Sequence, residues 1–258
     1  MHARRFLLAT LLLSLGCTLP IAGQARTLPD NGIEFVLGGD QWQPGHRFHA
    51  GHDWLALACI KRECTLEPAS LAVQAGTWQG HYDDQPTAGQ NLSFRRQIPG
   101  AGTVLGWFHL DSRMPWLSPG PVSTYAASTS GTKRPASEGT LEVAVDLPDH
   151  TQATLVPLYD RKQNGFLLQL RVPGKRQILE GIASCSHVLT PTYLVWAGDI
   201  DRDGKPDFLI DLSDEVGTAR LYLAGQAGPD EIAGVAGSYE PPPFGGECDG
   251  TGWLDTAY

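Results

Sequence analysis

The chain has 258 residues, of which 41% are hydrophobic and 18% are charged, and it contains 30 glycines and 19 prolines. The charged share is below the roughly 25% of an ordinary soluble domain, and the apolar share is too high for a wholly disordered chain. The many chain breakers argue against a helical bundle, a coiled coil or a doubly wound α/β enzyme. A net charge of −9 argues against nucleic acid as a partner and favours cations.

The first 25 residues are typical of a signal peptide. Arg4 and Arg5 precede an apolar run from Phe6 to Leu15, and small residues at 23–25 suit cleavage. Because that run is too short to cross a bilayer, we expect no transmembrane segment and a periplasmic or secreted protein. Cys17 ends a Ser-Leu-Gly-Cys sequence that is similar to a lipoprotein lipobox. Lipid attachment there is the less favoured alternative, because Ser14 stands where the lipobox usually has Leu.

Four further cysteines predict two disulfides in an exported protein, and three pairings are possible. We predict Cys59–Cys64, because a turn at 61–63 would bring these two residues together. We also predict Cys185–Cys248, which would hold the carboxyl-terminal tail. Free thiols or zinc ligands are the alternative, although the paired short spacings of zinc sites are missing.

Short segments in which apolar and polar residues alternate, bounded by turn residues, predict strands along the whole chain. In chain order they are Ile33–Leu37, Trp54–Ile60, Ser70–Gln74, Asn91–Arg95, Thr103–Leu110, Thr140–Leu147, Thr151–Leu158, Phe166–Val172, Gln177–Ile182, Tyr193–Trp196, Phe208–Leu212 and Ala219–Leu223. We therefore predict an all-β protein of two small antiparallel modules, sandwich- or barrel-like, at 29–118 and 138–258. Residues 119–137, rich in Pro, Gly, Ser and Thr, are the expected connection. Two packed sheets within one domain are the alternative.

The sharpest motif is the D-x-D-x-D-G-x-x-D sequence that begins at Asp199. Calcium takes about six to eight oxygen ligands, and alternating aspartates can direct several carboxylates to one ion. Gly204 would make the sharp turn of such a loop. The alternative to a calcium site is an acidic turn that is simply solvated. We predict a Ca²⁺ site with side-chain ligands from four aspartates and a backbone carbonyl ligand from a lysine: Asp199, Asp201, Asp203, Asp207 and Lys205.

Apolar segments flank this loop, which predicts a strand–loop–strand unit rather than the two helices of an EF-hand. Ile210 stands where an EF-hand has its glutamate. Residues 195–212 resemble the calcium loop of FG-GAP (integrin-type) repeats in bacterial secreted proteins. The resemblance implies the same five ligands. Because one copy cannot close a propeller, the resemblance extends to the loop alone.

Other motifs are weaker. His46, His49 and His52 could bind zinc or copper, but their glycine-flanked segment favours a surface loop. The seven tryptophans could contact a glycan or a cell surface, but packing in the β core is the favoured role for most of them. Those near Gly or Pro are expected to be the more exposed ones: Trp107, Trp116 and Trp253.

The sequence lacks the common catalytic motifs. It has no Gly-x-Ser-x-Gly elbow for a nucleophilic serine, no zinc-protease helix motif and no phosphate-binding glycine loop. We therefore predict a non-enzymatic, exported, calcium-binding β protein in which calcium stabilises the second module. The alternatives are a secreted hydrolase with an unrecognised carboxylate site and a carbohydrate- or surface-binding module.

Overall fold

The computed structural model describes residues 32–38, 41–42, 47–79, 85–97, 100, 102–111, 114–130, 142–160, 165–183, 193–212 and 219–239. Apart from short 3₁₀ turns such as η2 (Ala224–Gln226), the regular elements of these residues are all strands. The predicted all-β class is therefore confirmed. The predicted signal peptide, Cys17 and the Cys185–Cys248 pair lie outside the described residues.

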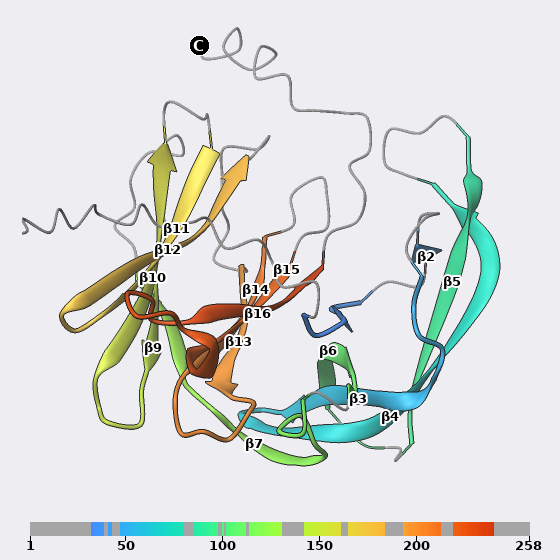
Figure 1. Ribbon diagram of the computed structural model, residues 1–258, viewed down its shortest axis with the longest axis horizontal. Helices are drawn as coiled ribbons and strands as arrows, with labels where there is room; N and C mark the ends of the chain where they lie inside the picture. Colours follow the sequence, from blue (N-terminus) through green and yellow to red (C-terminus); the bar gives the residue numbers. More distant parts are fainter. Residues whose placement is uncertain are drawn as a thin grey trace, which may run out of the picture.

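Eleven strands of the described residues form the larger sheet, in which neighbours pair antiparallel (Figure 1). The main path runs β1-β6-β3-β4-β7-β13-β14-β15-β16, with β5 beside β4 and β2 beside β5. The Ile33 N–H donates to the Ala236 carbonyl at 2.8 Å, so the end of the path returns to its beginning and the sheet nearly closes. The strands are β1 (Phe35–Val36), β2 (Gln41–Trp42), β3 (Gly51–Ile60), β4 (Glu63–Trp78), β5 (Thr87–Arg96), β6 (Thr103–His109), β7 (Gly120–Thr124), β13 (Leu194–Asp199), β14 (Asp207–Asp211), β15 (Ala219–Leu223) and β16 (Gly234–Tyr239).

The smaller sheet, of which β9 to β12 are labelled on the left of Figure 1, has the strand order β12-β11-β10-β9-β8 and is also antiparallel. It packs on one face of the larger sheet, because Val145, Leu155 and Leu170 share a buried cluster with residues of β14 and β15. Its strands are β8 (Ala127–Ser130), β9 (Glu142–Asp146), β10 (Gln152–Asp160), β11 (Gly165–Val172) and β12 (Lys175–Ala183).

Strand β14 contributes side chains to two separate cores. Leu209 lies in the cluster inside the larger sheet, together with Leu57 and Phe108. Its neighbours Phe208 and Ile210 lie in the cluster beneath the smaller sheet. Since alternate residues of a strand point to opposite faces and both faces are covered, this strand is apolar at consecutive positions.

Every segment predicted to be a strand overlaps an observed strand, but β2, β7, β8 and β16 were not anticipated. Two of them, β7 and β8, lie within residues 119–137, where a connection was expected. Gly120 and Pro121 weaken the local strand signal, yet β7 pairs with β4 on one side and with β13 on the other. The module boundaries at 118 and 138 remain predictions.

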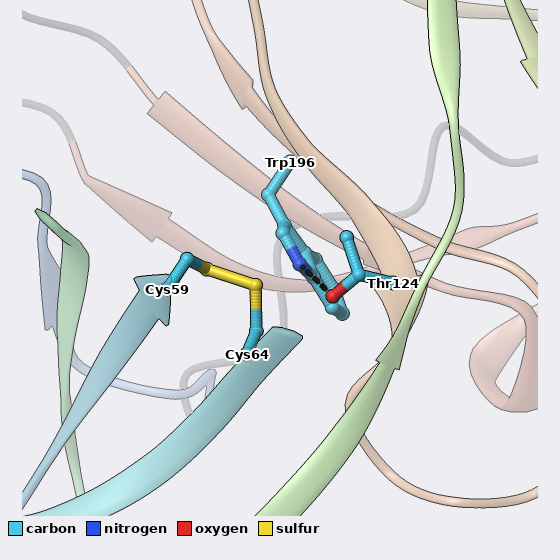
Figure 2. Close-up of a disulfide and its surroundings, with 4 residues drawn as sticks. All are labelled: Cys59, Cys64, Thr124 and Trp196. Atoms are coloured by element: carbon cyan, nitrogen blue, oxygen red, sulfur yellow. Dashed lines mark hydrogen bonds between the residues drawn. A yellow bond between two sulfur atoms is a disulfide. The ribbon is translucent and has the colours of Figure 1, made fainter. Parts of the chain in front are cut away.

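Cys59 and Cys64 form a disulfide, as predicted, with Cα atoms 4.1 Å apart. They face each other across the turn between β3 and β4. Figure 2 shows this disulfide near Trp196 of β13, whose Nε1–H donates to Thr124 Oγ1 of β7 at 3.1 Å. Both cysteines and Trp196 belong to the core inside the larger sheet, so the disulfide lies in a region to which β3, β4 and β13 all contribute.

Candidate metal centre

The acidic loop connects β13 to β14, as the strand–loop–strand prediction requires. Asp199 is the last residue of β13 and Asp207 is the first residue of β14. Gly198 stands opposite Asp207 in the register of this pair, and Asp199 stands opposite Ser123 of β7. The framework of the loop therefore has hydrogen-bonded strands on both sides of β13.

Three of the predicted ligands converge in the structure. One ligand atom each from Asp199, Asp201 and Asp207 lies within 4.8 Å of the others. Asp207 is fully buried, Asp199 is 8% exposed and Asp201 is half-buried. Asp199 Oδ1 is buried and accepts no hydrogen bond from the described residues. A buried carboxylate oxygen in this state is unfavourable unless a cation compensates its charge.

Backbone amides hold the other carboxylate oxygens in place. The N–H groups of Ile200 and Ala224 donate to the two oxygens of Asp207, at 2.8 and 3.1 Å. Gly204 N–H donates to Asp199 Oδ2 at 3.0 Å. These bonds orient the aspartates from two chain segments, the loop itself and the turn that follows β15.

The predicted turn at Gly204 is present. Gly204 has a φ of 82°, in the left-handed region where a side chain would be strained. A Cβ at this position would meet no atom within 4 Å, so backbone conformation rather than space requires the glycine.

Asp203 and Lys205 are arranged differently from the three converging aspartates. Asp203 lies outside that group, and its carboxylate accepts from Lys205 N–H at 2.8 Å and from Lys205 Nζ at 3.0 Å. The ammonium of Lys205 thus pairs with a predicted ligand. Ligation by Asp203 and by the Lys205 carbonyl remains a prediction, and it would compete with the pairing of the Asp203 carboxylate with Lys205.

Gly225 of η2 is a neighbour of the site that the sequence motif does not contain. A Cβ at Gly225 would stand 3.1 Å from Asp201 Oδ2 and 3.2 Å from Asp203 Oδ2. The glycine therefore leaves room beside two carboxylates of the loop. Its only sequence signal is a position after an apolar strand, which many turn glycines share.

The carboxylates interact strongly with their surroundings in the absence of a cation. Burial, and next the charge of Asp201, raises the pKa of Asp207 to about 8. Burial is also the main cause that raises the pKa of Asp201 to about 6. Burial and the charges of Asp199, Asp207 and Asp203 raise the pKa of the nearby Tyr125 to about 12. Each shift indicates a site in which negative charge is poorly compensated.

The donor set consists of carboxylate oxygens, which suit hard cations such as Ca²⁺. The uncompensated Asp199 Oδ1, the converging Asp201 and Asp207, and the space beside Gly225 fit the predicted calcium site.

The structure describes two of the three tryptophans that were expected to be exposed. Trp107 and Trp116 are half-buried, and Trp253 lies outside the described residues. The Trp107 ring stacks on Phe94 with ring centroids 4.7 Å apart, so one of its faces is covered.

Comparison with protein-family models, with curated proteins and with solved structures gave no match to this chain. Among the residues that the structure describes, no helix is long and apolar enough to span a membrane.

Proposed function

We propose that this chain is an exported calcium-binding β protein in which the ion has a structural role. The observation that carries the proposal is the Asp199 carboxylate, which converges with Asp201 and Asp207 and whose buried Oδ1 accepts no hydrogen bond from the described residues. A divalent cation among these carboxylates would compensate their charge. The resemblance of residues 195–212 to FG-GAP loops supports the same ion.

The position of the loop supports a structural role. Its ends are the ends of β13 and β14, two strands that contribute both to the core inside the larger sheet and to the core beneath the smaller sheet. An ion held by Asp199 and Asp207 would tie these strand ends together. Because Asp207 also accepts a hydrogen bond from the Ala224 N–H, the ion would help to hold the turn after β15. Because the unfolded chain would have no such site, binding adds to the free energy of unfolding.

Export is supported by the signal-like first 25 residues and by the Cys59–Cys64 disulfide, since disulfides persist in oxidising compartments. We propose a periplasmic or secreted location for the chain.

Calorimetric titration of the purified chain with CaCl₂ tests the proposal. We expect one calcium per chain, and loss of binding in Asp201→Asn, which removes one charge while keeping the shape of the side chain. The matched control is Asp230→Asn, which neutralises an exposed aspartate outside the loop. With about 1 mM calcium and a Kd of about 10 μM, ligation should stabilise the fold by about 2.7 kcal/mol.

The readout for that stabilisation is thermal unfolding with calcium and with EGTA. No calcium uptake, or the same uptake in Asp201→Asn as in the parent, would contradict the proposal. Binding without any change of unfolding temperature would contradict the structural role alone.

A further inference from the structure

A second group of possible metal ligands lies on the other half of the larger sheet. Glu34, His49 and His109 each offer one ligand atom, and these atoms lie within 4.8 Å of one another. They come from three separate segments: Glu34 precedes β1, His49 precedes β3 and His109 ends β6. Of the histidines that the sequence grouped with His49, His52 is an exposed residue of β3 outside this group, and His46 lies outside the described residues.

Backbone pairing brings these segments together. The His109 N–H donates to the Glu34 carbonyl at 2.9 Å, and His109 stands opposite Trp54 in the β3–β6 register. The Trp54 Nε1–H in turn donates to the His49 carbonyl at 2.7 Å. The backbones of Glu34, His49 and His109 are therefore positioned by hydrogen bonds independent of their side chains.

The possible ligand atoms of this group lie close to one another. His49 Nδ1 lies 2.6 Å and His109 Nδ1 lies 3.5 Å from Glu34 Oε2, and the two imidazole rings stack with centroids 4.7 Å apart. Zinc bonds to N and O of about 2.0–2.1 Å place two donors on one tetrahedral ion roughly 3.3 Å apart. The 2.6 Å contact is a hydrogen bond between His49 Nδ1 and Glu34 Oε2, which the ion would replace. Because the two imidazole planes lie at only 9° to each other, one ring would have to turn so that both Nδ1 lone pairs point to the same ion.

Asp53 orients His109 in the way that metal-binding histidines are commonly oriented. His109 Nε2 lies 3.0 Å from Asp53 Oδ2, on the opposite side of the ring from Glu34. If Nε2 donates its proton to this carboxylate, the neutral imidazole keeps its lone pair at Nδ1, which faces Glu34. A carboxylate behind a histidine both sets this tautomer and makes the ligand more basic.

We propose that Glu34, His49 and His109 bind a divalent transition-metal ion of the zinc class, with Asp53 as a positioning residue for His109. Carboxylates bind both ions, but imidazole nitrogens are ligands for zinc and not for calcium, so this site differs in chemistry from the acidic loop. Because the side chain of His49 is 69% exposed while His109 and Glu34 are 15% and 17% exposed, the ion would sit at the surface with its fourth position open to water.

Zinc titration of the untagged full chain, in buffer with excess calcium to occupy the acidic loop, tests this proposal. We expect one zinc per chain and at least a tenfold loss of affinity in His49→Ala and in Glu34→Gln. Asp53→Ala should weaken binding about 10- to 100-fold, as substitution of such an orienting partner does elsewhere. Co²⁺ in place of zinc should give the visible absorption of a tetrahedral complex in the parent but not in His49→Ala.

His52→Ala is the matched control, because it removes an exposed histidine of the neighbouring strand that lies outside the group. It should bind zinc like the parent, and so should Asp230→Asn, which changes an exposed aspartate outside both groups of ligands. The His49 side chain is largely exposed, so its removal should leave the β-sheet circular dichroism spectrum unchanged. No saturable zinc binding, equal binding by His49→Ala and the parent, or a larger loss in His52→Ala than in His49→Ala would overturn the proposal.

Discussion

The Arg202 guanidinium binds Ser118 at two points: Nη2 donates to the Ser118 carbonyl at 3.0 Å and Nη1 donates to the Ser118 hydroxyl at 3.2 Å. The same side chain donates to the carbonyls of Trp116 and Pro121, at 3.3 and 3.2 Å. Residues that are 84 positions apart in the chain are thus joined. Arg202 stands between two aspartates of the acidic loop, so its side chain attaches this loop to the segment that leads into β7.

Removing this attachment should destabilise the protein without removing the predicted calcium ligands. Arg202→Ala loses several charge-assisted hydrogen bonds, but because the side chain is exposed we expect a loss of only about 1 kcal/mol in chemical denaturation. Arginine and alanine are equally strained at the observed φ of 60°, so backbone strain does not contribute to the difference. Arg202→Lys keeps the charge but loses the planar fork, and should lie between the two. A variant as stable as the parent would show that the attachment is energetically neutral.

Gly225→Ala should weaken calcium binding several-fold. The added methyl group would stand 3.1 and 3.2 Å from oxygens of Asp201 and Asp203, so these carboxylates would have to shift by a few tenths of an ångström. Calorimetric titration with calcium measures the effect. Gly38→Ala is the control, because a Cβ there would meet no atom within 4 Å. Equal calcium affinities for Gly225→Ala and the parent would place the ion away from this turn.

The metal-free protein should lose stability as the pH rises from about 4 to about 8 through the titration of Asp201 and Asp207. Their pKa values are raised in the folded state from 3.8 to about 6 and about 8, so the folded state binds these protons more tightly than the unfolded state. The resulting stabilisation is fully present below the unfolded pKa and is lost as the pH rises through the folded values.

Denaturant unfolding in EGTA at several pH values measures this loss, and comparison with Asp207→Asn isolates the contribution of one group. The variant should show a shallower decline between about pH 4 and about pH 8, whatever its absolute stability. Parallel curves for the parent and Asp207→Asn would contradict the prediction.

The double variant Cys59→Ala/Cys64→Ala should unfold at a lower denaturant concentration than the oxidised parent. The disulfide closes a loop with a sequence separation of 5, for which the chain-entropy model gives about 2 kcal/mol. Loss of two buried side chains from the core adds to this figure. Unchanged stability would mean that the β3–β4 pairing alone holds the turn. In that case the single Cys59→Ala variant, which also lacks the disulfide, should be as stable as the parent.

The local sequence was sufficient to predict the strands whose side chains alternate or are continuously apolar, because such patterns require a sheet with at least one covered face. Strands β7, β8 and β16 could not be predicted in this way. They contain Gly, Pro and short polar residues, and their hydrogen-bond partners come from β4, β9, β13 and β15. Backbone pairing with distant segments, rather than local propensity, determines these strands.

The same division applies to the two groups of ligands. The local sequence determines the acidic turn. Aspartates two residues apart and a glycine that adopts the left-handed backbone conformation at 204 are properties of neighbouring residues alone. The contribution of Ala224 and Gly225 arises only in the tertiary structure, as does the meeting of Glu34 with His109. These residues are far apart in the chain, and only the order of strands in the sheet places their side chains within reach of one ion.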